Sequence, residues 1–148
     1  MDERKEKLIK KIVSMRPKGR PPHMDFYESG MIFVLNFLYD NSKKEIIAGD
    51  IAKKLDVSTA RVAKLLSKLT LKELIYTYPL ESDKRKTVVC LTEKGKLHTQ
   101  NKRKEHDDKL SKLIDKVGIE DMETFVNISE KIIKAFEKDR RDSFDKDL

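Results

Sequence analysis

Two short segments of the sequence combine positive side chains with neighbours that suit binding to a polyanion. In the first, Arg61 and Lys64 alternate with Ala60 and Ala63, and in the second, residues 83–86 read Asp-Lys-Arg-Lys. Small side chains let a backbone approach a surface closely, while Lys and Arg reach outward to negative charge. These two segments therefore favour contact with nucleic acid, which offers both phosphates and hydrogen-bonding edges.

The first segment is predicted to be a helix from Ser58 to about Lys72. Its apolar residues fall at helical spacing and form one buried stripe: Val62, Leu65, Leu66 and Leu69. Ser58 suits the N-cap, because its hydroxyl can accept an otherwise unpaired amide of the first turn. The opposite face and its flanks hold only small or cationic residues: Ala60, Arg61, Ala63, Lys64, Ser67 and Lys68. This face is expected to contact the partner.

The second segment is predicted to be the tip of a β-hairpin. Residues 75–79 and 87–91 are typical of strands, and residues 80–86 form the charged loop between them. Val89 and Leu91 then share one face of the sheet by the period of two. Ahead of these elements, the sequence predicts a short strand at 44–47, a compact helix around 51–55 and a turn at 56–58.

The remaining sequence is predicted to be helical. A helix over residues 3–15 leads into a basic, Pro-rich connector at 16–23, and a second helix, capped by Asp25, runs to Leu38. Thr92 is expected to cap a long helix that is polar between 98 and 109, as in helices that bridge two bodies through solvent. Gly118 ends that run, a last amphipathic helix follows, and the tail after Asp139 is expected to fray. The predicted fold class is mainly α (α+β): a winged helix-turn-helix with N- and C-terminal helical arms.

The charge is concentrated in the middle of the chain. The 148 residues include 33 Lys+Arg and 26 Asp+Glu, and residues 43–104 hold 16 of the cations against 7 of the anions. This distribution favours nucleic acid as the partner, and an anionic membrane surface is the second candidate. The alternative is that the lysines only keep the surface solvated and bind no partner. No apolar run approaches the roughly 18 residues of a membrane span. With one Cys and no apolar signal segment, the chain is expected to be a single soluble cytoplasmic domain.

The sequence offers no enzyme site. It has no phosphate-cradling Gly-rich loop and no nucleophile elbow, and its acidic pairs are scattered over helix surfaces. His98 and His106 are eight residues apart, whereas one metal ion needs a pair four apart on a helix, so neither they nor His23 predict a metal site. We expect no catalysis, no cofactor and no bound metal.

Several of these segments resemble the MarR family of bacterial transcription regulators. The resemblance is collinear over about residues 30–97, and it rests on Ile51-Ala52-Lys53-Lys54-Leu55-Asp56-Val57-Ser58, on Val62, Leu65 and Leu74-Ile75, on Asp83-Lys84-Arg85, and on Leu91-Thr92-Glu93-Lys94-Gly95. The Asp-x-Arg tip followed at a set distance by Leu-Thr-x-x-Gly is the most specific part. The arms match in pattern only.

The resemblance implies a homodimeric, sequence-specific repressor that binds a pseudo-palindromic operator in double-stranded DNA and is released by a small ligand or another signal. Residues 43–97 would be the DNA-binding lobe, residues 1–40 and 105–140 the helical dimerisation region, and residues 140–148 a frayed tail. By position, the resemblance makes Ser58 the cap of the recognition helix and assigns base and phosphate contacts to Thr59, Ala60, Arg61, Ala63 and Lys64. It makes Arg85 the wing arginine for the minor groove, with Asp83 orienting it. Lys68, Lys84 and Lys86 are added as expected DNA contacts because they are cations beside these residues.

Three positions depart from the family pattern. Asp56 and Glu73 stand where the family often has Gly, and Ile47 stands where a capping Ser or Thr is usual. A left-handed backbone is convenient at the first two positions, and Asp adopts it more readily than Glu does. We therefore expect a local distortion or a shifted helix end near Glu73.

Two other functions remain open from the sequence. The winged helix could be a protein-interaction module, which would bind random duplex weakly and without salt dependence. The chain could also be a small-molecule or redox sensor acting through Cys90, although no second Cys is present.

Overall fold

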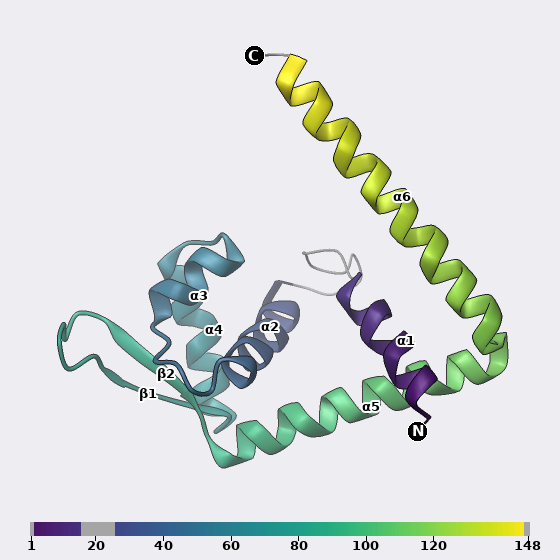
Figure 1. Ribbon diagram of the computed structural model, residues 1–148. Coiled ribbons are helices and arrows are strands. Elements are labelled where there is room, and N and C mark those ends of the chain that lie inside the picture. Colours follow the sequence, from purple (N-terminus) through teal and green to yellow (C-terminus); the bar gives the residue numbers. More distant parts are fainter. Residues whose placement is uncertain (1, 16–25, 147–148) are drawn as a thin grey trace. The chain divides into compact units, whose positions relative to one another are not determined.

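The structure is a computed structural model that describes residues 2–15 and 26–146. Its elements in chain order are α1 (Glu3–Ser14), α2 (Phe26–Asp40), α3 (Ala48–Leu55), α4 (Thr59–Leu71), β1 (Ile75–Pro79), β2 (Thr87–Leu91), α5 (Glu93–Val117) and α6 (Ile119–Lys146), as Figure 1 shows. The chain divides into two compact units, residues 19–104, called the lobe below, and residues 1–18 with 105–148, called the arm unit. The predicted fold class is confirmed.

Most predicted elements are present, with two differences. The expected strand at 44–47 is reduced to a single bridge between Ile47 and Val88, because the chain turns into α3 at Ala48. The helix α6 continues past Asp139 to Lys146, where fraying was expected. Alternating charges four residues apart along this last part, such as Lys138 and Asp142, favour the helix. The connector at 16–23 and the Asp25 cap lie outside the described residues.

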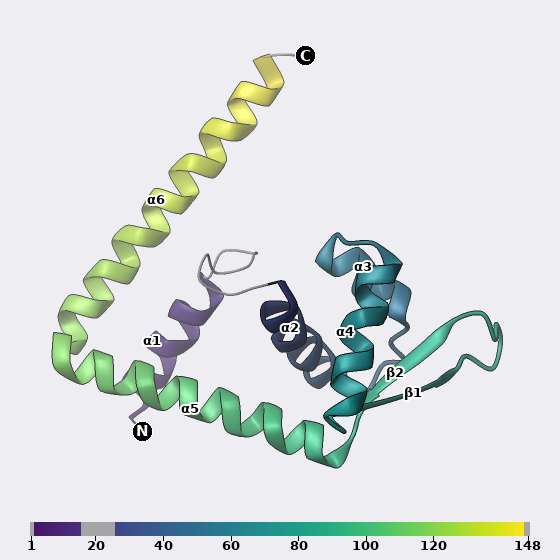
Figure 2. The same cartoon turned by 180° about the vertical axis from the view of Figure 1, so that it is seen from behind.

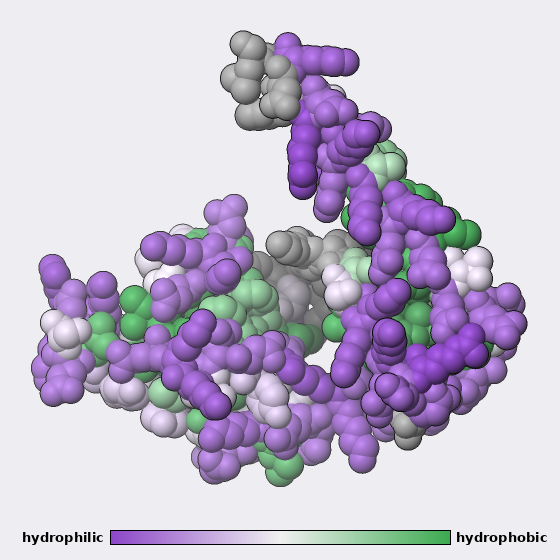
Figure 3. All heavy atoms as spheres, viewed as in Figure 1, coloured by the Kyte–Doolittle hydropathy of each residue, from purple (hydrophilic) through white to green (hydrophobic). Residues whose placement is uncertain are grey.

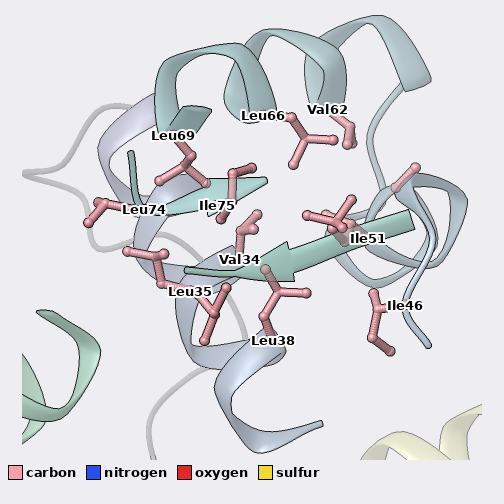
Figure 4. Packing of buried hydrophobic residues seen from close by; sticks show 13 residues of the cluster. Val34, Leu35, Leu38, Ile46, Ile51, Val62, Leu66, Leu69, Leu74 and Ile75 are labelled. Carbon is pink, nitrogen blue, oxygen red and sulfur yellow. The ribbon is translucent and has the colours of Figure 1, made fainter. Parts of the chain in front are cut away.

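The core of the lobe lies between α2, α3, α4 and the hairpin (Figure 4). Val34, Ile51 and Leu69 are fully buried there, and burial of each such side chain contributes about 1.5–3 kcal/mol. Gly30 allows α2 to approach α4, since a Cβ at this position would lie 2.9 Å from Leu65 Cδ2. Although residues 1–40 were expected in the dimerisation region, the helix α2 packs within the lobe.

The two helix ends with departures from the family pattern have a left-handed residue. Asp56 has φ 53° and Glu73 has φ 59°, so both adopt the left-handed backbone, and the helix end that was expected to be distorted or shifted near Glu73 is regular. At the end of α4, the Glu73 amide donates to Thr70 O at 2.9 Å, and the Leu74 amide donates to Leu69 O at 3.1 Å. These bonds pair the last carbonyls of α4 as in a Schellman motif, so the helix ends in a defined turn.

The turn after α4 is also bonded to the start of α5. Thr92 Oγ1 donates to Glu73 O at 2.7 Å and accepts from the Gly95 amide at 2.9 Å, which confirms Thr92 as the cap of α5. Lys94 Nζ donates to Lys72 O at 3.1 Å. At Ile47 the missing capping hydroxyl is offset by Asp50, whose Oδ2 accepts from the Ile47 amide at 3.0 Å.

The arm unit has a small core of its own. Leu8 and Ile9 of α1 pack with Ile114 of α5 and Val126 of α6. Arg4 forms a two-bond ion pair with Glu123, at 2.7 and 2.9 Å, and Lys5 pairs with Asp115. In residues 2–15 and 26–146, no helix has the length and apolar character needed to cross a membrane.

Candidate nucleic-acid interface

The helix α4 presents the predicted polar face to solvent. Ser58 is its N-cap, with Oγ accepting from the Arg61 amide at 3.3 Å, as the sequence predicted. The buried stripe of α4 anchors the helix in the lobe, and the other predicted contact residues are all exposed: Thr59, Ala60, Arg61, Ala63, Lys64 and Lys68. The uncharged members Thr59 and Ala63 lie on the flank toward the hairpin, whereas Arg61 and Lys68 lie on the other flank.

The hairpin has a regular antiparallel register and a charged tip. Its strands pair from Ile75 with Leu91 to Pro79 with Thr87, as predicted. Figures 1 and 2 show the hairpin extending beyond α3 and α4. Ile75, Val89 and Leu91 bury one face of the hairpin in the lobe core, so the strands hold the tip at a fixed place.

At the tip, Asp83 holds Arg85 in the predicted pair. The Asp83 carboxylate accepts from the Arg85 amide at 3.2 Å, from Nε at 3.1 Å and from Nη2 at 3.3 Å. The Arg85 side chain is nevertheless 91% exposed. Hydrogen bonds from the Arg85 side chain, followed by that from its amide, hold the pKa of Asp83 below its ordinary value. Lys84 and Lys86 are exposed on either side.

A groove of about 610 Å³ separates α4 from the hairpin. It is lined by residues from α3, α4 and both strands: Ala48, Thr59, Ala63, Leu66, Ser67, Thr70, Leu71, Thr77 and Thr87. The exposed flank of α4 and the inner side of the hairpin thus face one another within a single compact unit. Thr70, Leu71, Thr77 and Thr87 were not among the predicted contact residues, although the period of two places Thr77 and Thr87 on one face of the hairpin.

The first half of α5 is attached to α2 inside the lobe. Arg103 Nε donates to Asn36 Oδ1 at 2.7 Å, its Nη2 lies 2.9 Å from Asp40 Oδ1, and its guanidinium stacks 4.7 Å above the Tyr39 ring. Gln100 Nε2 donates to Tyr39 Oη at 3.0 Å. The stretch 98–109, expected to run through solvent, is therefore anchored over its first part by polar contacts that its apolar pattern could not reveal.

The other candidate residues of the sequence show no assembled site. Cys90 is half-buried on the outer face of the hairpin, where its interaction with the Tyr76 hydroxyl raises the pKa of Tyr76. His98 is exposed on α5. Among the described residues, no group of three or more His, Cys, Asp or Glu is arranged to hold a metal ion.

Two helices joined by a tight turn and followed by a hairpin define a winged helix. Residues 31–95 match the family described as winged helix DNA-binding domain, in agreement with the fold of the lobe. No curated protein sequence matches the chain.

Solved structures similar to the chain include MepR and YusO. MepR of Staphylococcus aureus, a transcription regulator of the multidrug efflux pump MepA, is 22% identical over 90% of both chains, with a TM-score of 0.66. YusO of Bacillus subtilis is 18% identical over 90% of this chain and 86% of its own, with a TM-score of 0.65. A MepR variant bound to an oligodeoxyribonucleotide is 23% identical over 90% of both chains, with a TM-score of 0.59. These structures share the fold of the chain, and the predicted resemblance is confirmed at the level of a winged helix fold.

Proposed function

We propose that the protein is a homodimeric transcriptional repressor that binds a pseudo-palindromic operator. The observation that carries this proposal is the groove itself, because α4 and the hairpin face one another across it and can reach one duplex together. The helix α4 would enter the major groove, which is about 12 Å wide, and Arg85 would enter the adjacent minor groove. The contact residues proposed on α4 and its cap are Ser58, Thr59, Ala60, Arg61, Ala63, Lys64 and Lys68, and those at the tip are Asp83, Lys84, Arg85 and Lys86.

The proposed dimer would form through the arm unit. Phe125, Ile128, Ile132 and Phe136 follow helical spacing along α6 and are 51–65% exposed. Figure 3 shows apolar residues at the surface of this helix between hydrophilic ones. Residues 131–143 of α6 have no buried side chain. An isolated helical segment as short as this one is only marginally stable in water unless its apolar face packs against a partner. A second copy of the chain would supply that partner, and two-fold symmetry would space the half-sites by about 10 bp.

Release from the operator would follow from a change in the spacing of the two lobes. The helix α5 is continuous from the lobe into the arm unit, and Arg103 fixes its first part to α2. A small ligand that binds one lobe spacing more tightly than the other would shift the population toward it. We propose that the protein has no catalytic activity. Because the proposed partner of the protein is chromosomal DNA, we expect it to act in the cytoplasm.

The experiment is the selection of bound duplexes from a random pool, followed by fluorescence anisotropy at several salt concentrations. The wild-type protein is expected to bind a palindromic sequence as a dimer, with an affinity that falls as salt rises. Lys64→Ala should weaken binding to all sequences and reduce the salt slope by about one. Lys146→Ala, at the exposed last residue of α6 and beyond the residues 105–140 expected to dimerise, is the matched control and should change neither.

Two results would contradict the proposal. Weak, salt-independent binding of all duplexes would favour a protein-interaction module, since phosphate contacts release counterions. A monomeric mass by sedimentation at micromolar concentration would exclude the proposed dimer. To test repression, the selected sequence would be placed over a promoter, and transcription in vitro should fall as protein is added.

A further inference from the structure

The groove between α4 and the hairpin has an unusual lining for a protein this rich in charge. Of the described residues that line it, none is charged, and five carry hydroxyl groups: Thr59, Ser67, Thr70, Thr77 and Thr87. The cations lie outside it, with Lys64 on the exposed face of α4 and Lys86 directly before Thr87. Neutral hydrogen-bonding groups therefore lie inside the groove, and positive charges lie at its edges.

Four of these hydroxyls have no hydrogen bond to any residue in the described parts of the chain. In helices, Ser and Thr hydroxyls commonly donate to the carbonyl four residues earlier. Thr70 does so within α4, and Thr99, Thr124, Ser129 and Ser143 do so elsewhere. Ser67 lies on the same helix as Thr70 but does not, and Thr59, Thr77 and Thr87 are likewise available to an outside partner.

Thr77 and Thr87 are placed together by the register of the hairpin. Thr77 pairs with Val89, and Thr87 is two residues from Val89 along β2, so the two Thr side chains are diagonal neighbours on one face. Ser67 lies across the groove from them on α4. Donors therefore reach the groove from both of its walls.

The geometry of duplex DNA determines what would run through this groove. Neighbouring major and minor grooves are separated by one sugar–phosphate strand. If α4 lies in the major groove and Arg85 in the next minor groove, that strand must pass between α4 and the hairpin. Phosphate oxygens accept hydrogen bonds from Ser and Thr hydroxyls, and such contacts fix register without reading sequence.

We propose that this groove holds one sugar–phosphate strand of the operator, and that Ser67, Thr77 and Thr87 donate hydrogen bonds to its phosphates. This inference rests on the proposed function, and it adds residues to the interface that the family resemblance did not assign. The hydroxyls are neutral, so their contacts displace few counterions. They contribute an affinity that salt does not remove, unlike that of Lys64 and Arg85.

The test compares hydroxyl and charge deletions in the full-length protein. Thr77→Val/Thr87→Val keeps the shape and β-propensity of the strands, and Ser67→Ala makes the same test from the helix. Each variant is measured by anisotropy on a selected duplex and on a random duplex, over a salt series. The double variant is expected to bind both duplexes about tenfold more weakly, and Ser67→Ala about threefold, with an unchanged salt slope. Lys64→Ala instead lowers the slope by about one.

The matched control is Ser143→Ala near the end of α6, beyond the residues 105–140 expected to dimerise, where the hydroxyl donates to Asp139 O at 2.9 Å. It should bind both duplexes like the wild-type protein. Wild-type affinity in the double variant and in Ser67→Ala would overturn the inference while leaving the proposed function intact. A loss confined to the selected duplex would also overturn it, because the hydroxyls would then contact bases. If the wild-type protein binds no duplex, the proposed function fails together with the inference.

Discussion

Gly95 lies very close to the backbone of Leu74, and replacing it with Ala tests the geometry that joins α5 to the wing. An added Cβ would lie 2.0 Å from Leu74 O, 2.9 Å from Leu74 C and 3.2 Å from Leu91 Cδ2. The Leu74 carbonyl is held in place, because it accepts a hydrogen bond from the Thr92 amide at 3.1 Å. The clash therefore involves backbone that cannot simply rotate away.

The expected loss of stability can be estimated from these contacts. Overpacking usually costs about 1–3 kcal/mol, and a clash with backbone belongs at the upper end of that range. Loss of the bond from Thr92 to Leu74 adds about 1 kcal/mol. Ala is better than Gly inside a helix by about 0.5–1 kcal/mol, which offsets part of the loss. Gly95→Ala should thus lower the free energy of unfolding by about 3 kcal/mol, or the Tm by about 10 °C at this chain length.

The assay is urea unfolding followed by circular dichroism, at equal protein concentrations. Gly49→Ala is the control, because the nearest atom to its added Cβ is Ile47 Cδ1 at 3.8 Å, an ordinary contact inside a helix. That variant should be as stable as the wild-type protein or slightly more stable. The reasoning is refuted if Gly95→Ala unfolds at the wild-type urea concentration, or if both variants lose the same stability.

Three more predictions concern the lobe. Leu69→Ala should lose about 3 kcal/mol in urea unfolding, whereas Leu71→Ala should stay within about 0.5 kcal/mol, since Leu69 is fully buried and Leu71 is 84% exposed. Arg85 depresses the pKa of Asp83 below 3.8, the ordinary pKa of an Asp carboxyl. The ion pair between Arg85 and Asp83 therefore persists at pH values above 3.8, and it is lost as the pH falls through the lower pKa of Asp83 in the folded protein. A carboxyl NMR titration should show this, and an unchanged midpoint in Arg85→Ala would contradict it. Glu73→Gly should raise the urea midpoint slightly by removing the strain of φ 59°; a lower midpoint would disprove that strain.

The sequence predicted the elements of the lobe well because their apolar residues follow simple periods. The buried stripe of α4 has a period near 3.6, and the residues of β1 and β2 fall where predicted. Single residues at helix ends were predicted equally well at the Ser58 and Thr92 caps and at Asp56, whereas the distortion expected near Glu73 is not observed. Such signals are local, so they can be read without knowing which elements meet.

Features that depend on contacts between distant residues were not predicted. Arg103 meets Asn36 across 67 residues of sequence, and nothing in the polar run at 98–109 distinguishes it from its neighbours. The placement of α2 in the lobe depends on packing between Gly30 and Leu65. The set of residues that line the groove could not be predicted from the sequence either, because they come from α3, α4 and both strands.

The arrangement of charge around the groove bears on how such a protein could bind DNA tightly and still select a sequence. Cations attract every duplex equally, so affinity built only from the lysines of residues 43–104 would hold the protein on random DNA. Small residues such as Ala60 and Ala63 let the α4 backbone approach base edges, where discrimination arises. Neutral donors such as Thr77 and Thr87 would position the DNA strand that lies between α4 and the hairpin on every duplex, through contacts that do not depend on salt. Selectivity in this lobe would then depend on the base contacts of α4, whereas the cations and the hydroxyls would provide affinity that all duplexes share.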